Sequence, residues 1–312
     1  MPLKSSQNLI PPSSQKAPDA QYSRHKNPLK QLRRRIYNRM FLPCMIWQER
    51  LFSHRKFKIL FSIKPEWEEQ IRTGFLHTEH EIAFREFSPL AIKEYDLVVP
   101  LTIEDLKYLN TVRELVAGNP IPVPSTEIIE LCDDKSRFNQ MLQKKGYGRF
   151  IPQTGGRLAY PYMVKKRTDS WGKSCHIIHD AKEEVACAKI LADQEYFSQQ
   201  LVAGTTEYAT HILFVEGKIL CWLNVEYTFE STSPIKGQDT EVIRSLCGCP
   251  YLALFSSILR SIDFKGLCCL NYKLSDNGQP MILENNPRFG GSLAPYFFSF
   301  IRHLKCGVAG QT

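Results

Sequence analysis

The stretch Ile282-Leu283-Glu284-Asn285-Asn286-Pro287-Arg288-Phe289-Gly290-Gly291-Ser292 carries most of the information about fold and chemistry in this chain. It follows two segments with strand character, residues 266–274 and 280–284, which are joined by Ser275-Asp276-Asn277-Gly278. An Asn-Gly pair between two apolar runs is a strong short-range signal for a β-hairpin. The quoted stretch is therefore expected to continue out of the second strand of that hairpin.

Three polar side chains are expected to meet on one face of this hairpin. Asn271 belongs to the first strand, while Glu284 and Asn286 stand two residues apart at the end of the second and so share a face. Carboxylate and amide oxygens suit Mg²⁺, which usually keeps several waters and also takes substrate phosphates. Arg288, two residues further on, is a bidentate donor for a phosphate. The hairpin therefore predicts a site for magnesium and phosphate.

The same stretch resembles the metal-binding segment of the ATP-grasp enzymes. It is most similar to the Glu-x-Asn-Pro-Arg form of the branch that includes carbamoyl-phosphate synthetase and related carboxylate–amine ligases. The resemblance extends over about residues 56–304. It implies one or two Mg²⁺ ions, with Mn²⁺ able to substitute, on Glu284 and Asn286 with Asn271 as a third ligand. It also implies that Arg288 steadies the transferring phosphoryl group.

Lysines in three further segments match the order of phosphate-binding elements in this family. Asp134-Lys135-Ser136, at the start of a helix, resembles the segment whose cation reaches the nucleotide phosphates. Pro161-Tyr162-Met163-Val164-Lys165 is similar to the strand whose lysine contacts the α- and β-phosphates. The loop Asp169–Ser174 stands where the family has a mobile phosphate loop, and Lys173 is its candidate ligand. This loop has one glycine where relatives have several, so a plain hairpin turn is the alternative.

The nucleotide base is expected at a hinge that follows these segments. Gln199, Gln200, Leu201 and Val202 resemble the residues that pair with the adenine edge, and Glu207 resembles the residue that holds the ribose hydroxyls. The resemblance thus implies ATP as the nucleotide. Relatives often carry a glutamate near the two glutamines, and because an amide oxygen accepts the same hydrogen bond, adenine is favoured while guanine stays open.

The fold class expected is α/β and α+β, because strand–helix–strand alternation gives way to hairpins and longer helices. Residues 1–55 are expected to form a basic, partly disordered arm, and residues 56–125 a small parallel α/β domain of the pre-ATP-grasp kind. Residues 126–312 would form the ATP-grasp domain, with a central subdomain at about 160–202 and a C-terminal subdomain at about 203–304. Besides the hairpin, strands are expected at 57–63, 95–100, 121–123, 162–165, 176–178, 197–202, 208–215 and 218–226, and helices at 64–73, 102–117, 135–145 and 241–262.

The net charge of +8 is concentrated in the N-terminal arm. Residues 1–58 hold thirteen Lys and Arg against two Asp and Glu, whereas the remaining residues hold 27 against 30. The basic part of the arm, residues 24–58, predicts weak contact with an acidic membrane or another acidic partner, with a solvated charged arm as the alternative. The body lacks the interleaved basic and aromatic residues of single-strand binders, so no specific nucleic-acid partner is expected.

Ten cysteines are spread over a chain that shows neither a secretory signal nor an apolar run of the ~20 residues that cross a bilayer. A cytoplasmic location with reduced, structural thiols is therefore expected. Cys247-Gly248-Cys249 and Cys268-Cys269 lack the spacing of a zinc site. In a strand, Cys268 and Cys269 would also point to opposite faces.

The reaction implied by the resemblance joins a carboxylate to an amine or similar nucleophile through an acyl phosphate, with ATP converted to ADP. The substrates would be small molecules or peptides. The resemblance makes a homodimer one candidate assembly, because many relatives form dimers, and the residues themselves leave the oligomeric state open. A non-catalytic, nucleotide-binding regulatory module is the alternative. Asn271 favours this alternative, because most relatives have an acid or a glutamine at its position.

Overall fold

The computed structural model describes residues 43–48, 56–115, 121–169 and 172–304. The described chain forms three sheets, with strand orders β2-β1-β3, β5-β4-β6 and β11-β10-β7-β8-β9. The first sheet is parallel and the other two are antiparallel. Most of the predicted arm, residues 1–55, lies outside the described residues, as do Ser170 and Trp171 of the predicted phosphate loop.

The N-terminal unit is the small parallel α/β unit that strand–helix alternation predicted. Its elements are β1 (Lys58–Phe61), α2 (Pro65–Phe75), β2 (Glu81–Phe84), α3 (Pro89–Lys93), β3 (Leu97–Val99) and α4 (Ile103–Thr111). Proline at the first position of α2 fits a helix start, because its missing N–H would be unpaired there in any case. Thr102 and Asp105 form a reciprocal capping box that fixes the start of α4.

The third strand of this sheet is not where the sequence placed it. Residues 121–123 form no strand; the Ile121 N–H donates a single hydrogen bond of 3.0 Å to the Val98 carbonyl. The missing strand is β2, which pairs with β1 along its whole length. Its four residues are too few for a clear periodic pattern, so pairing with β1 and not local preference determines it.

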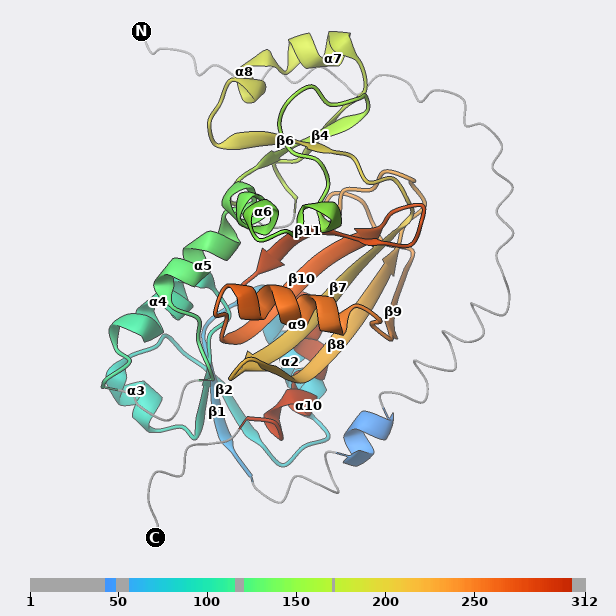
Figure 1. Ribbon diagram of the computed structural model, residues 1–312. Coiled ribbons are helices and arrows are strands. Elements are labelled where there is room, and N and C mark those ends of the chain that lie inside the picture. Colours follow the sequence, from blue (N-terminus) through green and yellow to red (C-terminus); the bar gives the residue numbers. More distant parts are fainter. Residues whose placement is uncertain (1–42, 49–55, 116–120, 170–171, 305–312) are drawn as a thin grey trace, which may run out of the picture.

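The middle of the chain links the N-terminal unit to a small antiparallel sheet. Its elements are α5 (Thr126–Asp133), α6 (Lys135–Lys144), η1 (Gly148–Phe150), β4 (Tyr162–Lys166), β5 (His176–Ile178), α7 (Ala181–Ala186), α8 (Ala188–Leu191) and β6 (Tyr196–Gln200). In Figure 1, α5 and α6 run up one side of the molecule toward this sheet, and α7 and α8 cover its far face. Asp134 both ends α5 and caps α6, so the chain turns sharply there.

The large sheet makes up most of the remaining chain. Its elements are β7 (Thr206–Val215), β8 (Lys218–Thr228), β9 (Ile243–Cys247), α9 (Leu252–Ser261), β10 (Gly266–Leu274), β11 (Pro280–Asn286), η2 (Gly291–Tyr296) and α10 (Phe298–Ile301). The hairpin of β10 and β11 confirms the prediction made from its Asn-Gly turn. The expected helix at 241–262 is wrong in its first part, because residues 243–247 pair with β8 as an edge strand.

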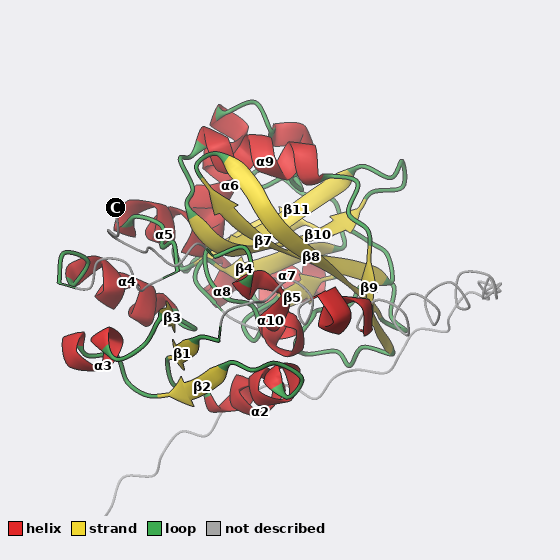
Figure 2. Cartoon of the chain, turned by 90° about the horizontal axis from the view of Figure 1, so that it is seen from below, coloured by secondary structure: helices red, strands yellow, loops and turns green. Residues whose placement is uncertain are grey.

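The two faces of the large sheet pack into different cores. One face packs against α9 and α6, through residues such as Ile212, Cys268 and Phe255. The other face contributes Cys269 to a core that also holds Phe61 and Trp67 of the N-terminal unit. Cys268 and Cys269 therefore point to opposite faces, as predicted, and the N-terminal unit shares a core with the large sheet. Figure 2 shows the molecule from below, with this unit beside the large sheet.

No helix in the described part of the chain is both long and apolar enough to span a membrane. The described cysteines are all free thiols. Burial raises the pKa of several of them, including Cys132 and Cys269, each to about 12. These thiols pack as small apolar side chains, in agreement with the structural role expected of them.

Candidate functional site

A cleft with about 1180 Å³ of unfilled space, open to solvent, lies between the small sheet and the large sheet. Every site residue predicted from the sequence lines this cleft except Lys173: Lys135, Lys165, Gln199, Gln200, Leu201, Val202, Glu207, Asn271, Glu284, Asn286 and Arg288. Lys173 is exposed and stands between Gly172 and Cys175, which do line the cleft. The fold thus brings together segments that are far apart in the sequence.

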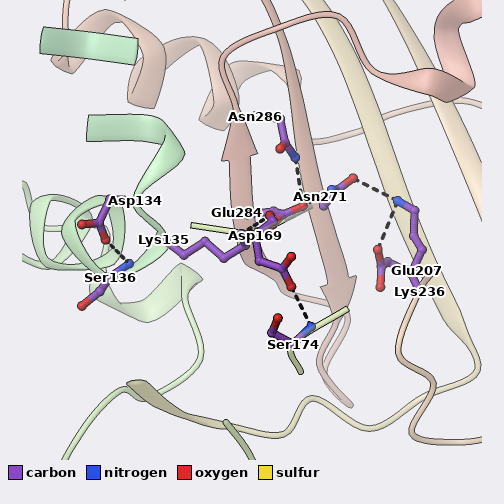
Figure 3. A network of polar contacts seen from close by, with 10 residues as sticks. All are labelled: Asp134, Lys135, Ser136, Asp169, Ser174, Glu207, Lys236, Asn271, Glu284 and Asn286. Carbon is purple, nitrogen blue, oxygen red and sulfur yellow. Dashed lines mark hydrogen bonds and ion pairs between the residues drawn. The ribbon is translucent and has the colours of Figure 1, made fainter. Parts of the chain in front are cut away.

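Glu284 lies at the centre of the predicted metal cluster (Figure 3). Its Oε1 accepts hydrogen bonds from Asn271 Nδ2 at 2.6 Å and from Asn286 Nδ2 at 2.9 Å. Its Oε2 lies 3.4 Å from Lys135 Nζ. Burial opposes the charged form of Glu284, but Lys135 and the two amides outweigh burial and lower the pKa to about 2. The carboxylate is therefore ionised, as a metal ligand must be.

The start of α6 holds Lys135 in place. Asp134 accepts hydrogen bonds of 3.0 Å from two backbone N–H groups of the first turn. It also accepts a bond of 2.6 Å from Arg167 Nη2, which lies just after β4. Burial raises the pKa of the Asp134 carboxyl, but the hydrogen bonds from Arg167 and from the backbone together outweigh burial, and the pKa lies below its ordinary value. Lys135 Nζ in turn donates to the Asp169 carbonyl at 2.7 Å, so α6 is joined to the loop that follows β4.

Two buried lysines face the cleft without a hydrogen-bonded or ionic partner among the described residues. Lys165 lies on β4 and Lys273 on β10, and their exposed fractions are 7% and 4%. Burial lowers the pKa of Lys165, and it lowers the pKa of Lys273 to about 8 although Glu207 opposes this. A buried cation is costly unless an anion compensates it, so both positions fit an anionic ligand. The alternation of residues 269, 271 and 273 along β10 is the signal that could have identified Lys273.

Lys236, from the segment between β8 and β9, is a second site residue that sequence reasoning missed. Its Nζ lies 3.2 Å from Glu207 Oε1 and 3.2 Å from Asn271 Oδ1 (Figure 3). It also lies 4.3 Å from the centre of the Tyr227 ring. Burial opposes its charge, but Glu207 and neighbouring groups raise its pKa above the ordinary value. A single lysine in a long loop carries no periodic signal by which it could have been found.

The wall beside the metal cluster combines two parts of the chain. Arg288 lies 5.7 Å from the ring centre of Trp67, which belongs to α2 of the N-terminal unit. A Cβ on Gly291 would lie 2.7 Å from Trp67 Nε1, so glycine is needed for this close approach. Ser292 Oγ is 2.7 Å from the Nε2 of His211, which is fully buried. Trp67 was missed because nothing in α2 indicates where its buried face packs.

The hinge residues lie at the end of β6. Gln199 is buried opposite Met163 of β4, and its Nε2 has no hydrogen-bond partner among the described residues. Gln200 is exposed and accepts a hydrogen bond of 3.3 Å from the Gln153 N–H. Leu201 and Val202 follow β6 and belong to no strand. The hinge thus presents one unpaired amide, together with backbone outside the sheets, to the cleft.

The donor chemistry fits a magnesium ion that is shared with phosphate. Within the described chain, no three His, Cys, Asp or Glu side chains gather as a metal site of their own. What the cluster offers is the carboxylate of Glu284 and the amide oxygen of Asn286, with Lys135 beside them. Oxygen ligands in this number suit Mg²⁺, which takes its remaining ligands from water and substrate phosphates. Zinc prefers nitrogen and sulfur ligands in a closed set and does not fit.

No family model matches the sequence, and no curated protein matches it. Solved structures do match. A biotin carboxylase–β-γ-ATP complex from Campylobacter jejuni has a TM-score of 0.56 at 12% identity, over 82% of this chain and 72% of that one. An L-amino acid ligase from Bacillus licheniformis has a TM-score of 0.54 at 15% identity, over 79% and 71%. A D-alanine–D-alanine ligase from Bacillus anthracis, complexed with ATP, has a TM-score of 0.51 at 15% identity, over 75% and 86%. All three are ATP-grasp ligases, which confirms the fold that the Glu284–Arg288 motif implied.

Proposed function

Because the chain has the ATP-grasp fold, we propose that it is an ATP-dependent ligase that activates a carboxylate and joins it to an amine or similar nucleophile. The solved structures it resembles are ligases of this general kind, several of them bound to ATP or ADP. ATP and Mg²⁺ are accordingly the proposed nucleotide and metal ion. The carboxylate and the nucleophile are small molecules or peptides in this proposal.

One observation carries the proposal. Glu284, an ionised glutamate that accepts hydrogen bonds from two amides, lies in the same cleft as the buried lysines Lys165 and Lys273, whose ammonium groups have no partner among the described residues. Among the described residues that line the cleft there are five Lys and Arg against three Asp and Glu. The three acids are Asp169, Glu207 and Glu284. An excess of buried positive charge around an acidic metal cluster matches a ligand that is itself strongly negative and arrives with a divalent cation.

Each cleft residue then has a role that follows from its position. Glu284 and Asn286 would hold Mg²⁺, which neutralises phosphate charge when it is bound. Lys135 and Lys165 hold phosphate oxygens, and Lys173 adds a further contact from its exposed loop. Arg288 steadies the phosphoryl group that is transferred. The hinge and ribose roles belong to the following residues: Gln199, Gln200, Leu201 and Val202 for the base, and Glu207 for the ribose.

The chemistry proceeds in two steps. A carboxylate oxygen of the substrate attacks the γ-phosphorus, and the bond from that phosphorus to the β–γ bridging oxygen breaks, giving an acyl phosphate and ADP. The nucleophile then attacks the acyl carbon, and phosphate leaves with the electron pair of the broken bond while the proton of the amine passes to solvent. Catalysis of this kind depends on positioning and charge neutralisation and needs no covalent nucleophile from the protein.

A specific observation favours the second candidate, a nucleotide-binding module without ligase activity. Asn271 supplies no charge to the cluster, and its oxygen faces Lys236. A cluster with one carboxylate fewer than is usual in the resembling family holds divalent cations less tightly. Nucleotide binding without ADP release would identify this second function.

Calorimetric titration with a non-hydrolysable ATP analogue and Mg²⁺ tests the proposal. Lys165→Ala is expected to weaken binding about ten- to a hundredfold, because a charge-assisted phosphate contact contributes about 1.5–3 kcal/mol. Lys166→Ala is the matched control, since Lys166 lies next on β4 and does not line the cleft. A GTP analogue tests the base preference. If the folded protein binds neither nucleotide, the proposal is wrong.

A further inference from the structure

Lys236 belongs to the segment between β8 and β9, and its side chain reaches the polar groups of the large sheet that line the cleft. Its ammonium group lies 3.2 Å from both Glu207 Oε1 and Asn271 Oδ1. The side chains of Lys236 and Glu207 are only 23% and 8% exposed. The Tyr227 ring lies beneath the same ammonium group, at 4.3 Å. Three groups on three separate elements therefore hold one cation at a defined place in the cleft.

The amide of Asn271 can take only one orientation between these neighbours. Its Nδ2 donates to Glu284 Oε1 at 2.6 Å, and its Oδ1 accepts from Lys236 at 3.2 Å. Exchanging the nitrogen and the oxygen would place N–H donors against an ammonium group and an oxygen against a carboxylate. The oxygen that Asn271 offers to a metal is therefore directed at Lys236. A divalent cation on that oxygen would lie next to a positive charge in a partly buried site.

The segment around Lys236 is fixed to the opposite side of the cleft. Gln238 Nε2 donates to the Gly172 carbonyl at 2.5 Å and to the Cys175 carbonyl at 3.0 Å. A Cβ on Gly172 would lie 2.9 Å from the Lys236 carbonyl oxygen, so the two backbones are in close contact. Asp239 accepts from the Ile235 N–H at 2.7 Å and closes the turn. The ammonium group is thus placed by backbone contacts as well as by its own charge.

We propose that the Lys236 ammonium group replaces a second metal ion in the cleft. It binds the Asn271 oxygen, so that only one divalent ion binds, on Glu284 and Asn286. The inference rests on the proposed function and deepens it. Lys236 is then a positioning residue for the nucleotide: it neutralises Glu207 and supplies, from the protein, positive charge that would otherwise come from a second metal ion. Asn in place of an acid at position 271 is consistent with this arrangement, since an acid there would bind the lysine and a metal ion in competition.

Counting bound Mn²⁺ by electron paramagnetic resonance tests this inference without measuring turnover. The full-length protein is saturated with a non-hydrolysable ATP analogue and titrated with Mn²⁺, and nucleotide binding is measured in the same samples. The wild type is expected to bind one Mn²⁺ for each bound nucleotide. The double variant Lys236→Met with Asn271→Asp removes the ammonium group and restores a carboxylate, and it is expected to bind two.

Lys166→Met is the matched control, because Lys166 lies next to Lys165 on β4 and does not line the cleft. It is expected to keep the count at one. Two Mn²⁺ ions in the wild type, or one in the double variant, would overturn the single-ion inference and leave the proposed function standing. A folded wild type that binds no nucleotide would overturn both. The wild-type count decides by itself if a variant does not fold.

Discussion

At the scale of single residues, Glu284 is the carboxylate on which the proposed metal site depends. Its carboxylate accepts two amide hydrogen bonds and faces Lys135 at 3.4 Å. Glu284→Gln keeps the shape of the side chain but removes the charge that would hold Mg²⁺. We expect ADP release to fall by at least about a hundredfold, since the positive charge that stabilises the transferred phosphoryl group is lost with the metal. A coupled ADP assay measures this, once a carboxylate and an amine that support turnover are found.

Glu69→Gln provides the control for this prediction. Glu69 is exposed on α2, far from the hairpin in the sequence and outside the cleft lining. The same chemical change there should leave both ADP release and the unfolding midpoint unchanged. Full activity in Glu284→Gln would remove Glu284 from the metal site, whatever the control shows.

His211 predicts a pH dependence of stability. Burial, reinforced by the nearby cations Lys236 and Arg288, lowers the pKa of His211 to about 3. In the unfolded chain a histidine titrates near pH ~6.5, so between about pH 6.5 and pH 3 the unfolded state binds the additional proton. The contribution of the neutral His211 to the free energy of unfolding is therefore fully present above about pH 6.5, and it decreases by about 1.4 kcal/mol for each pH unit below that value.

Urea unfolding at about pH 7 and about pH 5 measures this effect. The free energy of unfolding of His211→Gln should fall by about 2 kcal/mol less than that of the wild type over this interval. His77→Gln, which removes an exposed imidazole, is the control and should behave like the wild type. Equal losses in the wild type and in His211→Gln would show that His211 does not titrate as a buried neutral group.

The site residues that the sequence revealed are those whose relation is local. Asn271, Glu284 and Asn286 lie on one hairpin, so a period of two and a recognisable turn bring them together. Lys236 and Trp67 reach the same cleft from a loop and from the N-terminal unit, and their approach depends on how distant elements pack. No spacing rule within one segment contains that information.

At the scale of elements, the same distinction separates correct from incorrect predictions. The hairpin β10–β11 and the helix α6 carry their own turn and capping signals, and both form where the sequence places them. The strand β9 was expected to be helical, but its residues supply an edge strand to β8. Strand preference at an edge depends on the neighbouring strand more than on the residues themselves, so the error is one of tertiary context.

The contact between α2 and the segment after Arg288 predicts a sharp response at Gly291. A methyl group there would meet Trp67 Nε1 at 2.7 Å and Trp67 Cε2 at 3.0 Å. We expect Gly291→Ala to lower the free energy of unfolding by about 1–3 kcal/mol, the usual cost of overpacking a closely packed contact. Chemical denaturation measures the change, with Gly248→Ala as the control, because nothing lies within 4 Å of a Cβ at Gly248.

A double-mutant cycle separates this contact from a general effect of alanine. Trp67→Phe removes the pyrrole ring that carries Nε1, so Gly291→Ala should cost less in that background than in the wild type. We expect an interaction energy of about 1 kcal/mol or more, as is usual for residues in direct contact. Additive effects of the two substitutions would show that the α2 contact is not what constrains Gly291.

At the scale of the whole molecule, the cleft depends on all three sheets being packed together. The small sheet and the large sheet supply opposite sides of the cleft, and the N-terminal unit supplies Trp67 through a core it shares with the large sheet. The site is therefore a property of the packed chain and not of one segment. Sequence resemblance indicated this architecture because its motifs occur in the family's order, although the approach of the sheets to one another could not be predicted from it.

The distribution of charge predicts that the N-terminal arm and the cleft act independently. Residues 1–42 hold nine Lys and Arg against one Asp and therefore carry a net charge of +8. The entire chain also has a net charge of +8, so residues 43–312 are neutral overall. Deleting residues 1–42 removes no residue that lines the cleft. We therefore expect the affinity for the ATP analogue to stay within about twofold of the full-length value, because exposed charges beyond a Debye length are screened. Calorimetry on both proteins measures this.

The same deletion removes seven of the eleven Lys and Arg of the basic segment 24–58 and should strongly weaken any binding to anionic lipid vesicles. A basic segment near a membrane gains about 1 kcal/mol for each Lys or Arg, and salt weakens this attraction. Co-sedimentation of the full-length protein with anionic vesicles is therefore expected at about 0.05 M salt and should be lost at about 0.3 M. Strong binding that survives both the deletion and the higher salt would have to come from contacts of residues 43–312 other than charge attraction. A deletion that weakens nucleotide binding would instead place the arm at the cleft and contradict the independence argued from charge.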